Sequence, residues 1–403
     1  MFDYQRKNNF FAQAPGKMEE LCEQELKELG ATNIRTAYRG VYFQAEPAVL
    51  YKINYTSRLL TRVLAPLFTF NCKSTNDIKN SASKTKWEKL ISLNTTFAIT
   101  ASVSNSKITH SKYAALCLKD SIADYFNAKY KKRPNVDTRT PDVRLNLHIE
   151  KELATVSLDV SGESLHKRGY RLSSGEAPMQ ETLAAALIRI SEWNGEKPFW
   201  DCMCGSGTII SEAMMKYCNI PAQYLRENFG FFNLPDFDKS LWEKVKTDCD
   251  KNIRPLPKGL IKGSDISPKA IEIAKENIGR LPHSENVHIF NRPFQKAENF
   301  EEGVIVTNPP YGIRIGEKEE AKSLMKELGD FLKQKCSGTS AFIFTGDPAL
   351  RKSIGLKTSQ RVHLVNGKLE GVLFRIDSFK GTHKERKTQE GRAEESEKNK
   401  IKN

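Results

Sequence analysis

Residues 307–312 of this 403-residue chain read Thr-Asn-Pro-Pro-Tyr-Gly and directly follow the apolar run Gly-Val-Ile-Val at 303–306. A short β-branched run that two prolines interrupt is typical of a buried strand that ends in a loop. The prolines donate no backbone hydrogen bond but keep their carbonyl acceptors. The loop therefore presents an amide, a fixed carbonyl and an aromatic ring at a strand end. These groups suit a planar ligand that carries an amino nitrogen.

A second loop lies upstream, at residues 200–209, with the sequence Trp-Asp-Cys-Met-Cys-Gly-Ser-Gly-Thr-Ile. It precedes residues 209–217, whose apolar positions recur with helical spacing. A strand, a Gly-x-Gly turn and a helix are typical of a nucleotide-type cofactor site, because glycines let the backbone approach a ligand and a helix start offers unpaired N–H groups. The loop has neither the lysine of a phosphate-binding loop nor the third glycine of a dinucleotide site.

A third element ends at Asp265, which follows the apolar run at 259–261. An acidic residue at the end of a second strand can accept the hydroxyl hydrogens of a ribose. The next residues predict a helix, because Ser267 can cap its start and Pro268 suits its first turn.

The two loops, the acidic strand end and their order resemble class I S-adenosylmethionine-dependent methyltransferases that modify exocyclic or amide nitrogens. More narrowly, the chain is similar to bacterial guanine-N2 RNA methyltransferases that carry an N-terminal THUMP RNA-binding domain. The resemblance covers about residues 5–377, and its most specific further segments are 165–171 and 177–187. It implies S-adenosyl-L-methionine as the cofactor and RNA as the substrate.

The resemblance also implies the roles of individual site residues. The expected catalytic residues are Asn308, Pro309, Pro310 and Tyr311. The expected cofactor-binding residues are Asp201, Cys204, Gly205, Ser206, Gly207, Thr208, Asp265 and Asn308. The chain departs from the family pattern in three places, one of which is Ile313, where the family often has a glutamate. Cys202 replaces the usual proline, and residues 290–294 lack the aspartate that the family places near the adenine.

The formal net charge of +14 favours a polyanionic partner. Residues 129–133 and 166–171 interleave aromatic rings with cations, which can stack on unpaired bases and neutralise phosphates. Either cluster alone is also typical of a solvated surface. Together with the loops they predict RNA contacts by Lys131, Lys132, Arg133, Lys167, Arg168 and Arg171.

The eight cysteines form no Cys-x-x-Cys pair and have no histidine cluster nearby, so the sequence predicts reduced thiols and no metal site. Cys204 as a nucleophile is the alternative to a packed thiol. No apolar run approaches the roughly 18 to 20 residues that span a bilayer, and the N-terminus lacks the apolar core of a secretory signal. We therefore expect a cytoplasmic protein without a membrane partner.

The expected fold is α/β: a ferredoxin-like segment and a THUMP α+β region, followed by a Rossmann-like doubly wound methyltransferase domain. The parts are the N-terminal segment 1–45, the THUMP domain 46–160, a linker 161–176, the methyltransferase domain 177–379 and a basic, disordered tail 380–403. The clearest predicted elements are strands at 97–103 and 143–149, a helix at 116–126 between them, and late strands at 341–345 and 371–376 that form an antiparallel edge.

The function expected from these features is methyl transfer to the exocyclic N2 of a guanine, first of all in 23S ribosomal RNA. Transfer RNA is an open alternative substrate. The loop at 307–312 equally suits adenine N6 or the glutamine amide of a release factor, although the basic upstream region favours RNA over a protein substrate. A non-catalytic RNA-binding factor that retains the fold is a further alternative.

Overall fold

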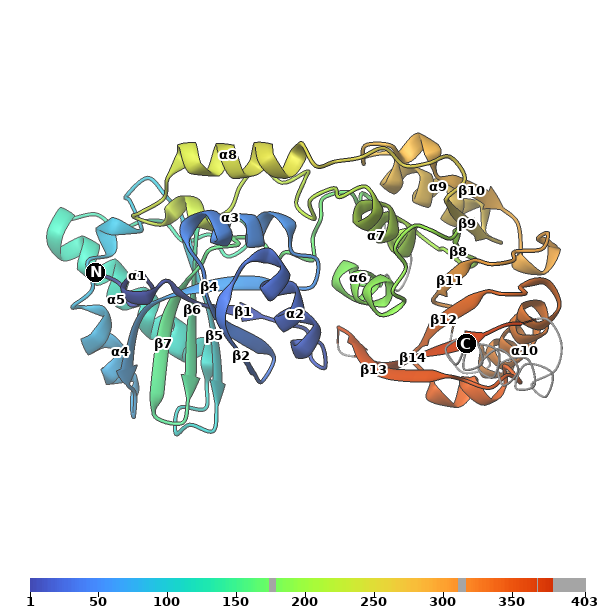
Figure 1. Cartoon of the computed structure of the whole chain (residues 1–403). Helices are drawn as coiled ribbons and strands as arrows, with labels where there is room; N and C mark the ends of the chain where they lie inside the picture. The colour runs from blue at the N-terminus through green and yellow to red at the C-terminus, as the bar shows by residue number, and fades with distance from the viewer. Residues whose placement is uncertain (174–178, 311–316, 368, 380–403) are drawn as a thin grey trace, which may run out of the picture.

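The computed structural model describes residues 1–173, 179–310, 317–367 and 369–379. It contains two seven-stranded mixed sheets, one in each half of the chain (Figure 1). The first has the strand order β2-β3-β1-β4-β7-β6-β5, and the second has the order β10-β9-β8-β11-β12-β14-β13. The expected combination of an N-terminal α+β region with a doubly wound domain is confirmed. The predicted tail 380–403 lies outside the described residues.

The strands of the first sheet are β1 (Asn9–Gln13), β2 (Thr32–Ala37), β3 (Gly40–Gln44), β4 (Arg62–Asn71), β5 (Phe97–Ser104), β6 (Val143–Glu150) and β7 (Leu153–Asp159). The helices of this half are α1 (Tyr4–Lys7), α2 (Glu19–Leu29), α3 (Pro47–Thr56), α4 (Thr75–Ala82), η1 (Trp87–Lys89) and α5 (Ser111–Tyr130).

The strands of the second sheet are β8 (Phe199–Asp201), β9 (Ile261–Asp265), β10 (His288–Asn291), β11 (Val304–Thr307), β12 (Ser340–Thr345), β13 (Gln360–Asn366) and β14 (Leu369–Asp377). The helices that follow the first sheet in the chain are α6 (Glu181–Ile190), α7 (Thr208–Tyr217), η2 (Gly230–Asn233), α8 (Lys239–Asp250), α9 (Pro268–Ile278), η3 (Ser284–Asn286), η4 (Phe294–Lys296), α10 (Glu317–Lys335) and η5 (Pro348–Lys352).

Strand β4 unites the N-terminal half, because it pairs with β1 on one side and with β7 on the other. The segments predicted as 1–45 and 46–160 therefore share one sheet, and their boundary stays a prediction. The predicted strands at 97–103 and 143–149 are confirmed as β5 and β6, which pair in parallel. In β6 buried residues alternate with more exposed ones, as the period-two pattern requires.

Helix α2 carries a carboxylate on its buried face, and the structure explains this break in the apolar pattern. Glu25 is only 7% exposed. Its carboxylate accepts hydrogen bonds from Ser57 Oγ at 2.6 Å and from the backbone N–H of Arg58 at 2.8 Å. The charge is therefore tolerated because it satisfies the chain that leaves α3.

The second sheet is parallel through β10, β9, β8, β11 and β12. Strand β14 then pairs antiparallel with β12 and β13, so the predicted antiparallel edge is confirmed. The sheet order runs from β8 to β9 in one direction and from β8 to β11 in the other. The direction in which the sheet is built therefore reverses at β8. Open α/β sheets bind ligands at the position where this reversal occurs, at the carboxyl ends of the strands.

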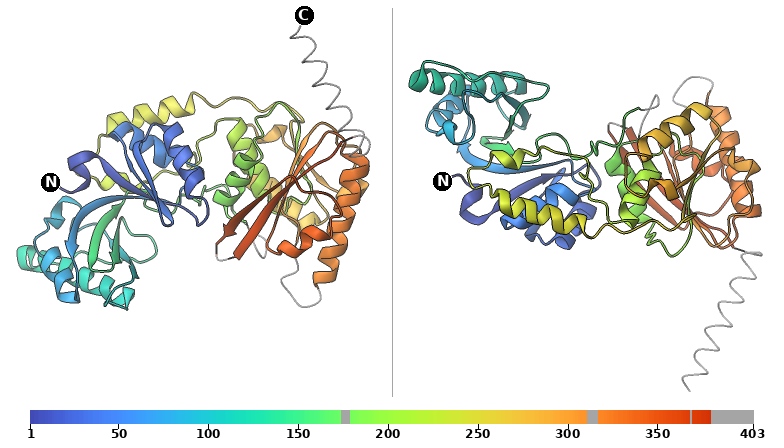
Figure 2. Two further views of the ribbon diagram at one scale, coloured as in Figure 1. Left: turned by 60° about the horizontal axis from the view of Figure 1, so that its bottom comes forward. Right: turned by 90° about the horizontal axis from the view of Figure 1, so that it is seen from above.

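Between α7 and β9 the chain returns to the N-terminal half, a feature that the sequence did not predict. Helix α8 packs along α3, as Figures 1 and 2 show. The ring of Phe231 stacks on Tyr51 with a centroid distance of 4.7 Å, and Trp242 contacts Tyr55 edge-on at 5.4 Å. The two halves therefore share an aromatic core as well as a covalent connection.

The described part of the predicted linker is tightly packed. Arg168 has a fully buried side chain whose Nε lies 3.2 Å from Oε1 of Glu212 on α7. Its guanidinium also donates to the Arg58 carbonyl at 2.5 Å and to the Leu165 carbonyl. Tyr170 adds a hydrogen bond to Glu212. Arg168 thus joins the segment after α3, by a hydrogen bond, to α7, by a buried ion pair.

Breaking this pair should destabilise the chain strongly. We expect Arg168→Met to lower the free energy of unfolding by about 3–5 kcal/mol, because it leaves the Glu212 carboxylate buried without its partner. Lys167→Met is the matched control, since Lys167 pairs with Glu163 on the surface and should change stability by no more than about 1 kcal/mol. Urea unfolding measures both variants, and equal midpoints would contradict the buried role of Arg168.

Candidate active site

Three polar residues meet at the carboxyl edge of the second sheet. Asp201 ends β8, Asp265 ends β9, and Asn308 follows β11. Parallel pairing of β8 with both neighbours places these strand ends side by side. Two hydrogen bonds join the strand ends. The Thr307 hydroxyl donates to Asp201 at 2.8 Å, and the Gly205 N–H donates to Asp265 at 2.9 Å.

The Gly-x-Gly turn lies between β8 and α7. Both glycines have positive φ, at +51° for Gly205 and +81° for Gly207. A Cβ on Gly205 would meet nothing within 4 Å, whereas a Cβ on Gly207 would lie 2.9 Å from Ile278 Cδ1 on α9. Gly207 therefore allows close helix packing, and Gly205 leaves backbone open to a ligand at the start of α7.

The loop after β11 contains an unsatisfied acceptor. Oδ1 of Asn308 is buried and has no hydrogen-bond partner among the described residues. The next residue, Pro309, is buried, and Pro310 is exposed. A buried carbonyl oxygen without a partner costs free energy, which a ligand donor can recover. The expected stacking residue Tyr311 lies outside the described residues.

Asp201 is 2% exposed, and burial raises the pKa of its carboxyl group to about 7. Nearby Asp265 adds to the rise, while the hydrogen bonds from Thr307 and from the Met203 N–H oppose it. Asp265 is more open, and its two oxygens accept from the N–H groups of Gly205 and Ser267. The site therefore combines one buried carboxyl group with one that borders solvent.

Asn277 on α9 is a site residue that the sequence reasoning missed. It is 1% exposed, and its amide donates at 3.1 Å to the carbonyls of both Ser206 and Ser173. Its Oδ1 accepts from the Leu172 N–H at 2.9 Å. One buried side chain thus fixes the Gly-x-Gly turn to the linker. In the sequence it is one polar position on an amphipathic helix, so no motif marks it.

The two thiols of the turn are structural. Cys202 is 1% exposed and Cys204 is 6% exposed. Burial raises the pKa of both thiols above their ordinary value, which disfavours a nucleophilic thiolate. All eight cysteines of the chain are free thiols.

The edge beside Asp265 offers apolar surface and an amide where the family usually has an acid. Ile266 is 72% exposed and Phe290 is 43% exposed. Asn291 directs its Nδ2 toward the backbone carbonyls of Asp265 and Ile266, each at 3.0 Å. The described residues contain no group of three side chains suited to a metal ion. They also contain no helix long and apolar enough to cross a bilayer.

The predicted RNA-binding residues divide into two groups. Lys131, Lys132 and Arg133 are exposed just after α5, and Lys167 is exposed in the linker. The side chains of Arg168 and Arg171 instead bond to partners within the protein.

The prediction for Arg168 is wrong, because its guanidinium is enclosed between Glu212 and two backbone carbonyls and cannot reach a phosphate. Arg171 is half-buried and donates to Thr208 Oγ1 at 2.9 Å and to the Met179 carbonyl at 2.8 Å. It therefore supports the first residue of α7. The alternation of aromatic and basic residues at 166–171 does not indicate that Arg168 is buried, because the sequence does not show which cations have a buried acid nearby.

The strand order, the antiparallel β14 and the polar strand ends together define a class I methyltransferase domain. Family models match three segments: an RlmL ferredoxin-like domain at residues 9–64, a THUMP domain at 72–159 and an RMKL-like methyltransferase domain at 168–375. The chain belongs to the RMKL-like methyltransferase family.

Curated relatives agree with this assignment. A putative RNA methyltransferase of Synechocystis sp. is 37% identical over 92% of this chain and 97% of its own length. The ribosomal RNA large subunit methyltransferase K/L of Syntrophotalea carbinolica is 37% identical over 91% of this chain, and that of Photobacterium profundum is 32% identical over 91%. The chain spans about half the length of these two K/L proteins, 53% and 52%.

Solved structures share the whole architecture. The putative methyltransferase SMU.472, solved in complex with SAH, superposes with a TM-score of 0.82 at 27% identity and covers 93% of this chain and 99% of its own. A predicted N6-adenine-specific DNA methylase from Listeria monocytogenes gives 0.80 at 25% identity, covering 92% and 96%. TrmN from Thermus thermophilus, at 17% identity and a TM-score of 0.68, shows the same fold.

The raised pKa of Asp201 predicts a pH dependence of stability. The carboxyl group has a pKa near 3.9 in the unfolded chain and about 7 in the folded chain, so its protonated form favours folding. This contribution is fully present below about pH 4 and is lost as the pH rises to about 7, on the order of 4 kcal/mol in total. Asp201→Asn stays neutral and should lack this decline. If the unfolding free energies of the wild type and of Asp201→Asn change with pH in parallel, the raised pKa of Asp201 is contradicted.

Proposed function

We propose that this chain transfers a methyl group from S-adenosyl-L-methionine to the exocyclic N2 of a guanine in RNA, with 23S ribosomal RNA as the first substrate. The observation that carries the proposal is the buried, unpaired Oδ1 of Asn308 at the end of β11, beside the Gly-x-Gly turn. An acceptor in this position can take a hydrogen bond from the amino group of a ligand that binds at the carboxyl edge of the sheet.

The residues of the turn fit the cofactor. The backbone at Gly205 is open to a ligand, and the first turn of α7 offers unpaired N–H groups. We assign the amino-acid portion of the cofactor to residues 204–208 with Asp201, and its ribose to Asp265. The exposed side chain of Ile266 follows Asp265 and gives the adenine an apolar surface. The cofactor supplies a methyl group that its sulfonium already activates.

The protein therefore contributes position and charge complementarity. The guanine amino lone pair is delocalised into the ring, so the nitrogen must move toward tetrahedral geometry before the lone pair can attack. Oδ1 of Asn308 and the Pro309 carbonyl accept the two amino hydrogens and direct the lone pair toward the methyl group. The same acceptors stabilise the positive charge that develops on nitrogen. We assign Tyr311 to stacking on the base and Pro310 to shaping the loop.

A neutral amide is sufficient for this chemistry. The methylated nitrogen becomes acidic and loses its proton to water, so no strong base is required before transfer. The target guanine must be unpaired or flipped out, because its N2 is engaged in Watson–Crick pairing inside a helix.

The substrate class rests on the N-terminal half. A THUMP domain match, exposed Lys131, Lys132 and Arg133, and the net charge of +14 all favour RNA. The K/L relatives are named for the large-subunit ribosomal RNA, which supports 23S ribosomal RNA over transfer RNA. An enzyme that acts on this substrate works in the cytoplasm.

Adenine N6 is the second candidate target, because adenine presents an amino group of similar shape. The observation in its favour is the Listeria monocytogenes neighbour, which is described as an N6-adenine-specific DNA methylase. The two targets give different methylated nucleosides, so one assay separates them.

The first prediction for this function concerns Asn308. Wild-type protein, tritium-labelled S-adenosylmethionine and unmodified 23S ribosomal RNA should give N2-methylguanosine on nucleoside mass spectrometry. Asn308→Ala should lower the transfer rate constant by about 10²- to 10³-fold, because it removes an acceptor that stabilises developing charge, and should leave cofactor affinity nearly unchanged. N6-methyladenosine as the product would establish the second candidate. Unchanged turnover in the variant would remove Asn308 from the mechanism.

The second prediction concerns Asp265. We expect Asp265→Ala to weaken S-adenosylhomocysteine binding in calorimetry by roughly 10- to 100-fold, because a charged acceptor for the ribose hydroxyls is lost. Asp238→Ala is the matched control, since Asp238 also accepts a backbone N–H, at 3.0 Å, but caps α8 on the N-terminal half. An unchanged dissociation constant for Asp265→Ala would remove this residue from the site.

A further inference from the structure

The first three strands of the chain carry an aromatic stripe, which we define as Arg35, Tyr42 and Phe11. Tyr42 of β3 lies directly opposite Phe11 of β1 on one side and Arg35 of β2 on the other. Directly opposed residues of neighbouring strands point to the same face of a sheet. The three side chains therefore form one row across β2, β3 and β1.

The stripe lies on the face away from the hydrophobic core. Phe10 and Phe43, which alternate with the stripe along β1 and β3, are 3% and 1% exposed and belong to the core. Tyr42, in contrast, is 43% exposed, Arg35 is exposed and Phe11 is half-buried. Large apolar rings on an open sheet face are unusual unless they serve a contact.

The rings of the stripe are in contact and are tilted by 55° relative to each other. Phe11 and Tyr42 have centroids 4.8 Å apart, and the Arg35 guanidinium lies 4.7 Å from the Tyr42 centroid. A Cβ on Gly40 would lie 2.1 Å from Cζ of Phe11, so this glycine makes room for the Phe11 ring along the sheet. The position of the rings is therefore set by the strands before any ligand binds.

The surroundings of the stripe match a nucleic-acid base and its phosphate. Strands β1, β2 and β3 contain no aspartate or glutamate. One step along the strands, Gln44 of β3 lies opposite Asn9, and its Nε2 donates to Asn9 Oδ1 at 2.8 Å. These three strands thus combine rings, amides and a cation, which is the composition that stacks bases, bonds their edges and attracts phosphate. Two carboxylates lie beyond them: Glu46 accepts from Asn8 Nδ2 at 3.1 Å, and Asp159 of β7 is buried and paired with Arg62.

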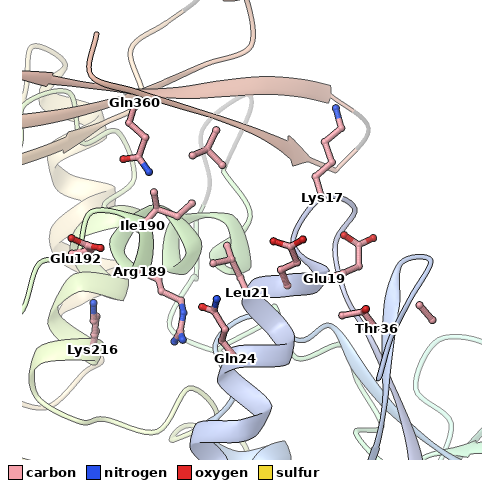
Figure 3. Close-up of a pocket in the computed structure, with 13 residues that line it drawn as sticks. Lys17, Glu19, Leu21, Gln24, Thr36, Arg189, Ile190, Glu192, Lys216 and Gln360 are labelled. Atoms are coloured by element: carbon pink, nitrogen blue, oxygen red, sulfur yellow. The ribbon is translucent and has the colours of Figure 1, made fainter. Parts of the chain in front are cut away.

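The stripe also lies close to the junction of the two halves. Tyr38, in the turn between β2 and β3, is 89% exposed. Residues 36–37 at the end of β2 line a groove of about 1030 Å³. Figure 3 shows Lys17 and Thr36 on one side of this groove and Arg189 and Gln360 of the methyltransferase half on the other. The groove opens on the α2 side of the sheet, since Thr36 pairs with the core residue Val41, so the stripe and the groove share only the end of β2.

We propose that the aromatic stripe is a stacking platform for an unpaired base of the RNA substrate. The inference rests on the proposed function for its ligand class and adds a contact surface outside the THUMP match at 72–159. The base displaces the Arg35 guanidinium from the face of Tyr42 and stacks on that ring, and Arg35 then neutralises the adjoining phosphate. The amides of Gln44 and Asn9 exchange their mutual hydrogen bond for bonds to the base edge. A second copy of this chain is the competing occupant, and the experiment below distinguishes it.

The test measures binding of the full chain to a short, unstructured, fluorescently labelled RNA by anisotropy. Tyr42→Ala should raise the dissociation constant roughly 5- to 100-fold, because base stacking on an aromatic ring is lost. Tyr42→Phe is the matched control and should bind like the wild type, since it keeps the ring. Binding of a blunt RNA duplex of equal length should respond little to either change.

Further measurements keep the outcome interpretable. Arg35→Ala removes an exposed side chain with little effect on folding and should weaken binding with a reduced salt dependence. Unchanged binding of single-stranded RNA by Tyr42→Ala would overturn the platform and leave the methyltransferase assignment intact. If Tyr42→Ala abolishes a dimer seen for the wild type in sedimentation but keeps RNA binding, the stripe is a dimer contact and the platform is also overturned. If the wild type methylates no RNA while Tyr42→Ala still weakens binding, the platform stands and the proposed reaction fails.

Discussion

The parallel hydrogen-bonded pairing of β8 with both β9 and β11 is the constraint on which the site depends. Parallel strands end at the same edge, so three residues far apart in sequence meet there. The hydrogen bonds from Thr307 to Asp201 and from Gly205 to Asp265 then join the loops that follow the strands. The result is an edge on which the buried Asn308 acceptor has no partner within the described residues.

The two halves of the chain are held together by more than their connection in sequence. The Arg168–Glu212 pair ties the linker to α7, and Asn277 ties the same linker to the Gly-x-Gly turn. Helix α8 adds an aromatic contact with α3. Because α7 begins at the Gly-x-Gly turn, Arg168 connects the Arg58 carbonyl of the N-terminal half, through Glu212, to the helix that starts at this edge of the second sheet. In the proposed function, an RNA held by the N-terminal half would therefore meet the Asn308 edge at a defined position.

Much of this arrangement follows from local sequence, and its limits are physical. Strand ends and turns are marked by proline, glycine and β-branched runs, so the sequence correctly predicts that β8 ends before the Gly-x-Gly turn and that β11 ends before Asn308. Long-range partners leave no such mark. The sequence predicts a surface position for Arg168, because its partner Glu212 is 44 residues away in the chain. Asn277 is an ordinary polar position of a predicted helix, and nothing nearby in the sequence indicates its bond to Ser206. The return of 221–257 to the N-terminal half depends on aromatic packing that has no local signature.

The most direct test of the central claim is a crystal structure of the chain with S-adenosylhomocysteine and an RNA fragment that contains the target guanine. We predict that the guanine amino nitrogen lies about 2.7–3.2 Å from both Asn308 Oδ1 and the Pro309 carbonyl oxygen, in line with the cofactor sulfur. A complex in which the amino group faces away from these two oxygens, or in which a protein donor occupies Asn308 Oδ1, would contradict the account.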